Sequence, residues 1–168
     1  MDLYLVRHAV AFKRDRGRWS DDADRPLTPE GEEDFRVVAG ELGRIVPGVE
    51  LVLSSPYARA WRTAEILNEE TTWPIPRVFS ALEPEIPPHK ILTALATYAE
   101  AETLALVGHR PSLHELAAYL LVGDEDTLNI GLKKGGAACI RFKGPPGPGG
   151  GKLRWLLTPQ ILGSMRGV

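Results

Sequence analysis

The stretch Leu3-Tyr4-Leu5-Val6-Arg7-His8-Ala9 decides the fold class of this chain and indicates where its chemistry lies. Its leading apolar residues predict a short buried strand over residues 3–6, and that strand ends in an arginine and a histidine. In open α/β sheets, ligands bind at the carboxyl ends of the strands. We therefore expect Arg7 and His8 to lie at a ligand site.

A second apolar run ends in the same way. Residues 103–107 predict another buried strand, and Gly108-His109 follows it directly. A third predicted strand, over residues 51–53, leads into a helix that carries Arg59 in its first turn. The sequence therefore predicts that two histidines and two arginines reach one edge of a sheet.

These residue types suit a site that handles phosphate. A phosphoryl group in transfer spreads negative charge over its equatorial oxygens, so catalysis requires fixed positive donors and an in-line nucleophile. Arginine stays charged and presents a rigid fork to phosphate. Neutral imidazole can attack phosphorus, and the resulting phosphoramidate can be hydrolysed. The pattern predicts a phosphate site at which one of the two histidines is covalently modified.

The order of the predicted elements favours an α/β three-layer sandwich. Strands alternate with helices, which indicates a mainly parallel central sheet flanked by helices. Three helix starts carry capping signals: Thr28-Pro29, Ser55-Pro56, and Ser112 with Glu115 three residues later. The remaining predictions are a short strand over residues 77–79, helices over 90–98 and 112–121, and strands over 137–142 and 153–157. The Gly- and Pro-rich residues 144–151 predict a mobile hairpin connection.

Length and composition limit the functions that the chain can have. A chain of 168 residues suits one domain, and a net charge of -2 argues against nucleic-acid and membrane partners. No apolar stretch approaches the roughly 20 residues of a membrane span, and the start Met1-Asp2-Leu3 lacks the features of a signal peptide. We therefore expect a cytoplasmic protein in which the lone Cys139 is a small core residue.

Four blocks of the sequence, in order, resemble the motifs of the histidine phosphatase (phosphoglycerate-mutase-like) superfamily. In length and in its last block, the chain is most similar to the small phosphohistidine phosphatases of the SixA type. The blocks are residues 3–9 with their Arg-His pair, residues 25–31 (Arg-Pro-Leu-Thr-Pro-Glu-Gly), residues 54–64 with Ser-Pro-x-x-Arg-Ala, and residues 107–113 with Gly-His.

This resemblance implies a fold and a mechanism. It implies a phosphoglycerate-mutase-like sandwich that lacks the large helical insertions, with residues 1–168 forming a single histidine-phosphatase domain. His8 would be the nucleophile that becomes transiently phosphorylated. Arg7, Arg59 and His109 would bind the transferring phosphoryl group, and water would then release phosphate. The family needs neither a metal nor a cofactor.

The chain departs from the family pattern in two places. Ala9 stands where the family has glycine. The catalytic acid of larger members has no clean counterpart, because Glu83 and Glu85 both lie slightly out of pattern; Glu83 is the leading candidate for a proton donor. A leaving imidazole needs less protonation than an alkoxide, so this departure matters less for a phosphoramidate substrate. A short chain without a helical roof also favours an open pocket for phosphate on a protein surface.

The sequence therefore predicts a metal-independent phosphatase that acts on phosphohistidine in proteins, such as a histidine phosphotransfer protein. Two alternatives stay open: a phosphomonoesterase for a small phosphorylated metabolite, and a phosphate-binding module without turnover. Arg25 either orders its own loop or binds substrate. The basic residues 13–18 form either a solvated loop or an attractive surface for a phosphorylated partner. His114 is predicted to be an ordinary surface or capping residue.

Overall fold

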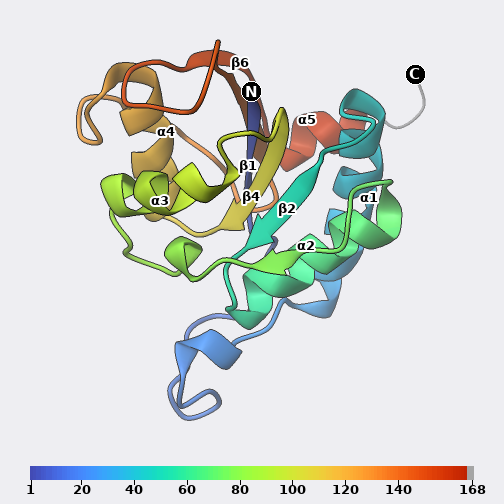
Figure 1. The fold of residues 1–168 in the computed structure, drawn as a ribbon. Coiled ribbons are helices and arrows are strands. Elements are labelled where there is room, and N and C mark those ends of the chain that lie inside the picture. Colours follow the sequence, from blue (N-terminus) through green and yellow to red (C-terminus); the bar gives the residue numbers. More distant parts are fainter. Residues whose placement is uncertain (166–168) are drawn as a thin grey trace.

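Within residues 1–165, which the computed structural model describes, six strands form a single mixed sheet in the order β3-β2-β4-β1-β5-β6 (Figure 1). The strands β3, β2, β4 and β1 run parallel to one another, whereas β5 and β6 are antiparallel additions at one edge. This arrangement confirms the predicted mainly parallel sheet. The strand bounds are Asp2–Arg7 (β1), Leu51–Ser54 (β2), Arg77–Val78 (β3), Thr103–Gly108 (β4), Ala137–Arg141 (β5) and Lys152–Leu157 (β6).

Helices cover both faces of the sheet, so the predicted three-layer sandwich is confirmed (Figure 1). The face formed with α1, α2 and α5 carries one core cluster, and the face formed with α3 and α4 carries another. The α-helices are Pro29–Ile45 (α1), Ala58–Glu70 (α2), Pro88–Leu95 (α3), Ser112–Val122 (α4) and Pro159–Ser164 (α5). Three short 3-10 turns, Asp22–Asp24 (η1), Ser80–Leu82 (η2) and Ala96–Tyr98 (η3), complete the described elements.

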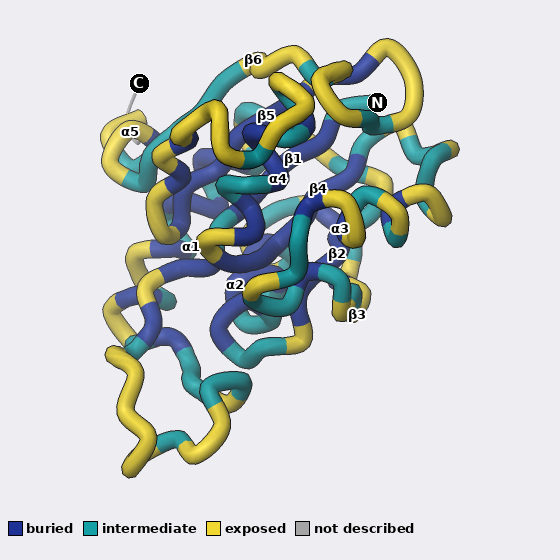
Figure 2. Tube along the Cα trace, turned by 90° about the vertical axis from the view of Figure 1, so that its left-hand side faces the viewer, coloured by how far each residue is buried: buried dark blue, intermediate teal, exposed yellow. Residues whose placement is uncertain are grey.

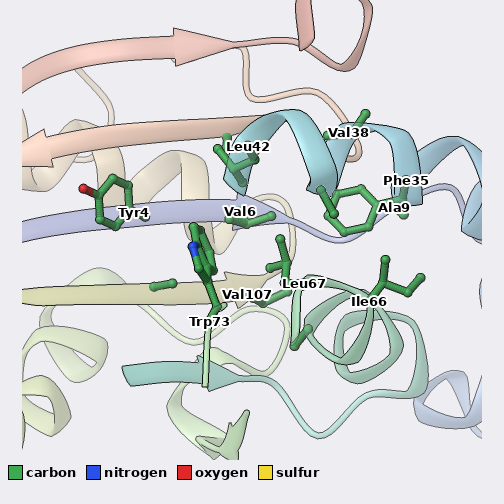
Figure 3. Close-up of a cluster of buried hydrophobic side chains, with 14 of the residues drawn as sticks. Tyr4, Val6, Ala9, Phe35, Val38, Leu42, Ile66, Leu67, Trp73 and Val107 are labelled. Carbon is green, nitrogen blue, oxygen red and sulfur yellow. The ribbon is translucent and has the colours of Figure 1, made fainter. Parts of the chain in front are cut away.

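The two central strands, β1 and β4, are apolar on both faces because both faces are covered. Tyr4 and Val6 of β1 pack toward α1 and α2, whereas Leu3 and Leu5 pack toward α3 and α4. Figure 3 shows the first of these clusters, in which side chains from β1 and β4 meet the helices and Trp73. A parallel strand buried on both faces reads as a continuous hydrophobic run. This is why the sequence predicts both strands.

The register of these two strands positions the candidate site. Arg7 at the end of β1 lies beside Gly108 at the end of β4, so the residues that follow each strand are neighbours. The backbone N–H of His8 donates to the carbonyl of Gly108 at 3.0 Å. The chain thus places His8 and His109 together at the carboxyl edge of the sheet.

Of the three predicted helix caps, one is confirmed and two are wrong, although the predicted helix over residues 112–121 is present as α4. Thr28 caps α1, because its hydroxyl accepts from the N–H of Gly31 at 2.9 Å and Pro29 is the first helical residue. The helix α2 begins at Ala58 rather than at Pro56, and the hydroxyl of Ser55 is engaged elsewhere. Ser112 is the first residue of α4 rather than its cap, and its side chain forms no cap bond.

The C-terminal hairpin has the predicted strands, but its loop is not a free connection. The backbone N–H groups of Gly149 and Gly151 donate to the carbonyls of Tyr119 and Leu120 at the end of α4, at 3.0 and 2.9 Å. A Cβ added at Gly151 would lie 2.6 Å from Cγ2 of Ile140, so glycine permits this close approach. The loop is therefore anchored to α4, which contradicts the mobile connection that its composition predicts.

Two expectations about the chain as a whole can be compared with the described residues. Cys139 is buried on β5 as a free thiol, as expected for a core residue. Over residues 1–165, no helix is both long enough and apolar enough to cross a membrane.

Candidate active site

The two histidines that follow the central strands face each other at the carboxyl edge of the sheet. The ring centroids of His8 and His109 are 5.2 Å apart, and the two residues are only 6% and 1% exposed. The sequence predicted this proximity from the two strand ends alone. Two buried imidazoles therefore lie next to each other at this edge of the sheet.

The surroundings of His8 determine which of its ring nitrogens is free. Its Nδ1 lies 2.7 Å from the carbonyl oxygen of Ala9, and because a carbonyl can only accept, Nδ1 carries the proton. Nε2 therefore keeps its lone pair. Burial, followed by the positive charges of Arg59 and Arg7, lowers the pKa of His8 to about 3. His8 is consequently a neutral imidazole at pH 7, with Nε2 available as a nucleophile.

The backbone next to His8 is also held in place. The N–H of Ala9 donates to Oγ1 of Thr63 at 3.0 Å, and the same hydroxyl donates to the carbonyl of Arg59 at 2.7 Å. This chain of hydrogen bonds connects the turn after β1 to the first turns of α2. The position of His8 relative to Arg59 is therefore set by the packing of α2 against the sheet.

Whereas His8 uses Nδ1, His109 forms its hydrogen bond through Nε2. Its Nε2 lies 2.9 Å from Oγ of Ser55, which itself accepts from the N–H of Tyr57 at 3.3 Å. Where the serine hydroxyl donates to Nε2, the ring proton of His109 lies on Nδ1, which has no hydrogen-bond partner among the described residues. Burial lowers the pKa of His109 to about 2, with His8 and Arg59 adding to the effect, so the ring is neutral.

Two arginine side chains lie at the same edge and are largely withdrawn from water. Arg59 is only 4% exposed, and it donates from Nη1 to the carbonyl of Asp22 at 2.8 Å and from Nη2 to Oδ2 of Asp22 at 3.0 Å. Arg7 donates from Nη1 to the carbonyl of Leu132 at 3.0 Å. Burial lowers the pKa of both arginines, yet guanidinium groups remain charged at neutral pH. Withdrawing two cations from water is costly unless an anion compensates for them.

A further observation concerns the buried polar atoms that lack partners. Buried donors and acceptors are normally hydrogen-bonded, and leaving one unsatisfied costs about 1–3 kcal/mol. Within the described residues, the buried side-chain atoms without a partner are Arg7 Nε, Arg59 Nε, His109 Nδ1 and Ser112 Oγ. Three of the four belong to residues that the sequence selected as phosphate ligands. A bound oxyanion would satisfy donors of this kind.

Arg25 and Asp22 form the side of the site that belongs to the loop after β1. Arg25 donates from Nε to Oδ1 of Asp22 at 2.8 Å and from Nη1 to the carbonyl of Phe12 at 2.7 Å. Asp22 therefore bridges Arg25 and Arg59, and its hydrogen bond with Arg25 holds the pKa of the carboxyl below its ordinary value. Of the two roles predicted for Arg25, these contacts support the ordering of its loop.

Lys134 is a cation at the site that sequence reasoning missed. Its charge, with those of the arginines, lowers the pKa of His8, and its own pKa is lowered by burial and by Arg7. The adjacent Gly135 donates its N–H to the carbonyls of Arg7 and His8 at 3.0 and 3.1 Å. Because β5 is antiparallel, its first residues meet the carboxyl ends of the parallel strands. The direction of β5 was the signal that could have revealed Lys134.

Glu83, the candidate proton donor, lies on the side of the site where Tyr57 packs near His109. The ring of Tyr57 is 5.3 Å from the ring of His109, and burial and the charge of Glu83 raise the pKa of Tyr57. Glu83 is half-buried, and its side chain forms no hydrogen bond or ion pair with the described residues. Glu85 is exposed and adopts a φ of 67° in the following turn. Glu83 thus lies near Tyr57 and, among the described residues, has no hydrogen bond to either histidine.

The expectation that His114 is an ordinary surface or capping residue is wrong. Its Nε2 donates to the carbonyl of Leu132 at 3.0 Å, and this carbonyl also accepts from Arg7. Burial lowers the pKa of His114, so its ring is neutral at pH 7. Sequence reasoning could not find this contact because it joins α4 to an irregular segment before β5.

The hydrogen-bond donors at this edge are guanidinium and imidazole N–H groups, which suit an anion. In the part of the chain that the structure describes, no cluster of three or more histidine, cysteine or carboxylate side chains could hold a metal ion. The arrangement combines a neutral nucleophilic imidazole with two guanidiniums and a second imidazole that donates. Such a set can hold a tetrahedral oxyanion against Nε2 of His8.

Comparisons with known proteins agree with this geometry. A family model described as the histidine phosphatase superfamily (branch 1) matches residues 3–79. An uncharacterized protein of Picosynechococcus sp. is 38% identical over 143 residues, which cover 84% of this chain and 85% of that protein. An uncharacterized chloroplastic protein of Arabidopsis thaliana is 30% identical over 181 residues, covering 94% and 78% of the two chains.

Among solved structures, the protein histidine phosphatase SixA complexed with tungstate has a similar fold. The TM-score is 0.82 at 24% identity, with 96% of this chain and 99% of that chain covered. Because nearly all of both chains superimpose, the predicted phosphoglycerate-mutase-like sandwich without large insertions is confirmed. The family model spans the Arg-His pair and the helix that carries Arg59, and the related sequences extend over most of the chain. The chain therefore belongs to the histidine phosphatase superfamily, and phosphatase chemistry is the activity that this membership supports.

Proposed function

We propose that residues 1–168 form a single histidine-phosphatase domain that hydrolyses phosphohistidine on proteins through a covalent intermediate on His8. The observation that carries the proposal is the hydrogen bond from Nδ1 of His8 to the carbonyl of Ala9. It leaves Nε2 unprotonated near buried nitrogens of Arg7, Arg59 and His109 that have no hydrogen-bond partner among residues 1–165. A free cysteine buried in the core suits the reducing conditions of the cytoplasm, where we place this activity.

The reaction proceeds in two displacements at phosphorus. In the first, the Nε2 lone pair of His8 forms a bond to phosphorus while the bond between phosphorus and the substrate imidazole breaks. The substrate nitrogen leaves with the electron pair and takes a proton. In the second, water attacks phosphorus, the bond to Nε2 breaks, and inorganic phosphate leaves while His8 regains its lone pair. The water proton is released to solvent or to phosphate.

The cationic side chains stabilise the charge that both displacements develop. Arg7 and Arg59 would bind equatorial oxygens through their free Nε–H groups, and His109 would donate from Nδ1. The low pKa of His8 keeps the nucleophile neutral, since a protonated imidazole cannot attack. Because these donors are held by the sheet edge and by α2, little reorganisation is needed when the phosphoryl group arrives.

The choice of phosphohistidine rests on the position of the acids. An ester leaves as an alkoxide and needs a general acid, whereas an imidazole is a better leaving group that accepts a proton readily. Among the described residues, Glu83 forms no hydrogen bond or ion pair with His8 or His109 that would hold its carboxylate in place as an acid. Asp22 is unsuitable as an acid because its ion pairs keep it deprotonated.

A direct comparison of substrates tests the proposal. Phosphate release should be faster from a phosphohistidine-bearing protein than from sugar or nucleotide monophosphates, and Glu83→Gln should leave that rate unchanged. A preference for the esters that depends on Glu83 would instead identify a small-molecule phosphomonoesterase. Tight binding of a phosphopeptide without phosphate release would identify a phosphate-binding module.

A further inference from the structure

The loop between β1 and α1, residues 12–25, extends beyond the carboxyl edge of the sheet. The pairing of Ala11 with Leu27 closes its base, and the N–H of Phe12 donates to the carbonyl of Pro26 at 3.2 Å. Figures 1 and 2 show this 12–25 loop standing clear of the layered body, with most of its outer turn exposed. A loop of this length with a closed base is often functional.

The tip of the 12–25 loop is strongly basic. Its cations are all exposed: Lys13, Arg14, Arg16 and Arg18. Of these, Arg14 lies 3.8 Å from Asp22, whereas Lys13 and Arg16 form no ion pair with any described residue. The chain as a whole carries a net charge of -2, so this positive tip contrasts with the rest of the molecule. Such a local excess steers an anionic partner toward the surface that carries it.

The tip is ordered rather than loosely solvated. The guanidinium of Arg18 lies 4.5 Å from the ring centroids of both Phe12 and Trp19. Asp15 accepts from the N–H groups of Gly17 and Arg18 at 2.9 and 3.3 Å and thereby forms a tight turn. Cations held on an ordered turn lose less conformational entropy on binding than cations on a flexible one.

The base of the 12–25 loop lies at the phosphate site. Asp22 within the loop bonds Arg59 through both its carbonyl and its carboxylate, and Arg25 at the end of the loop bonds the same carboxylate. A protein that inserts a phosphorylated side chain toward His8 must therefore lie against this loop. The basic tip would then contact the protein surface that surrounds the phosphorylated residue.

We propose that the 12–25 loop is a docking surface for an acidic protein surface that flanks the phosphohistidine, with Lys13 and Arg16 as its free cations. This inference rests on the proposed function, because it identifies the partner of the same site. The interaction raises the rate of encounter more than it changes the chemical step, since rim charges act mainly on association. A free phosphoamino acid does not reach the tip and gains nothing from it.

The test compares three substrates: free phosphohistidine, a peptide with one phosphohistidine flanked by glutamates, and the same peptide with glutamines. In the double variant Lys13→Glu, Arg16→Glu, kcat/KM for the acidic peptide should fall about tenfold at low salt, and added salt should remove the difference. Turnover of free phosphohistidine should stay unchanged. The matched control is Lys143→Glu with Lys152→Glu, which makes the same change in net charge. These lysines lie at the opposite edge of the sheet, where Lys152 of β6 is the strand-register partner of Arg141 of β5. The control should behave as wild type.

Three results would overturn the docking proposal. One is an equal rate of the double variant and the wild type on the acidic peptide. Another is an equal loss in the control, which would mean that net charge alone matters. The third is inhibition by an oligonucleotide at lower concentration than by the unphosphorylated acidic peptide, which would indicate a nucleic-acid surface. A wild-type protein that hydrolyses none of the three substrates would instead overturn the proposed function itself.

Discussion

Arg59 donates both of its η nitrogens to Asp22, to the main-chain oxygen at 2.8 Å and to Oδ2 at 3.0 Å. The protein thus uses one side of a buried guanidinium to hold a loop, while Nε has no partner in the part of the chain that the structure describes. The carboxylate orients Arg59 and Arg25 together, but it also places a negative charge beside a site built for an anion. These two effects of Asp22 on phosphate binding have opposite signs and can be separated by substitution.

Asp22→Asn keeps an acceptor for Arg25 while removing the charge. We expect inorganic phosphate or tungstate to bind about fivefold more tightly, because the removal of a nearby like charge is worth about 1 kcal/mol in a partly exposed site. Inhibition constants measured at constant ionic strength give the comparison. Asp24→Asn, in the same loop and exposed, is the control and should bind these anions as the wild type does.

The hydrogen bond between Ser55 and His109 predicts an effect on the tautomer of the histidine. In Ser55→Ala, the ring of His109 loses the donor to Nε2, so the proton is no longer held on Nδ1. We expect kcat to fall about tenfold or more with a smaller change in KM, as for the loss of one donor to a transition-state oxyanion. The nitrogen chemical shifts of the His109 ring report the tautomer directly.

Ser54→Ala is the matched control for this change. Ser54 is also buried, but its hydroxyl donates to the carbonyl of Ser55 and not to a histidine. An equal fall in kcat for both serine variants, with an unchanged His109 tautomer, would mean that the effect is one of packing alone.

Lys134 and its neighbour Lys133 allow a similar pair of substitutions. Lys134→Gln removes a charge that acts on His8, so the affinity for phosphate should fall about fivefold. Lys133→Gln removes the same charge from the adjacent lysine, which is also exposed but is not among the groups that lower the pKa of His8. Equal inhibition constants for the two variants would contradict the placement of Lys134 at the site.

The low pKa of His8 predicts how stability depends on pH. The ordinary pKa of 6.5 applies in the unfolded chain, whereas the folded pKa is about 3, so the unfolded state binds more protons between these values. Stability is therefore full above pH 6.5 and decreases as the pH falls toward 3. The loss due to His8 is at most about 1.4 kcal/mol per pH unit.

Urea unfolding at a series of pH values measures this slope. His8→Gln should flatten it, because the substituted side chain binds no proton in either state. An unchanged slope would mean that His8 is accessible to protons in the folded protein. His89→Gln is the control, since His89 is exposed on α3.

The sequence predicted the sheet and the meeting of Arg7, His8, Arg59 and His109 at its edge because both rest on local pattern. Apolar runs on β1 and β4 are buried on both faces, and His8 and His109 follow them directly. The start of α2 was predicted incorrectly because a serine before a proline indicates a cap, and no local signal shows that Ser55 bonds a histidine 54 residues away. Lys134 and His114 were missed for the same reason, since the direction of β5 and the path of the segment before it are properties of the whole fold.

The loop of residues 144–151 is a different kind of error. Its glycines and prolines exclude helix and strand, as predicted, but composition says nothing about tertiary hydrogen bonds. Gly149 and Gly151 donate N–H groups to the carbonyls of Tyr119 and Leu120 near the end of α4. Composition therefore predicted the absence of regular structure correctly and the degree of anchoring incorrectly.

The most direct measurement is the detection of a phosphoryl adduct on the nucleophile. The protein is mixed with a phosphohistidine-bearing protein, quenched rapidly without acid, and analysed by mass spectrometry beside His8→Ala. We predict a phosphoryl group on the His8 ring of the wild type, formed and lost at rates that match turnover, and neither adduct nor phosphate release in the variant. Full phosphate release by His8→Ala, or an adduct that resides on another residue, would contradict the account.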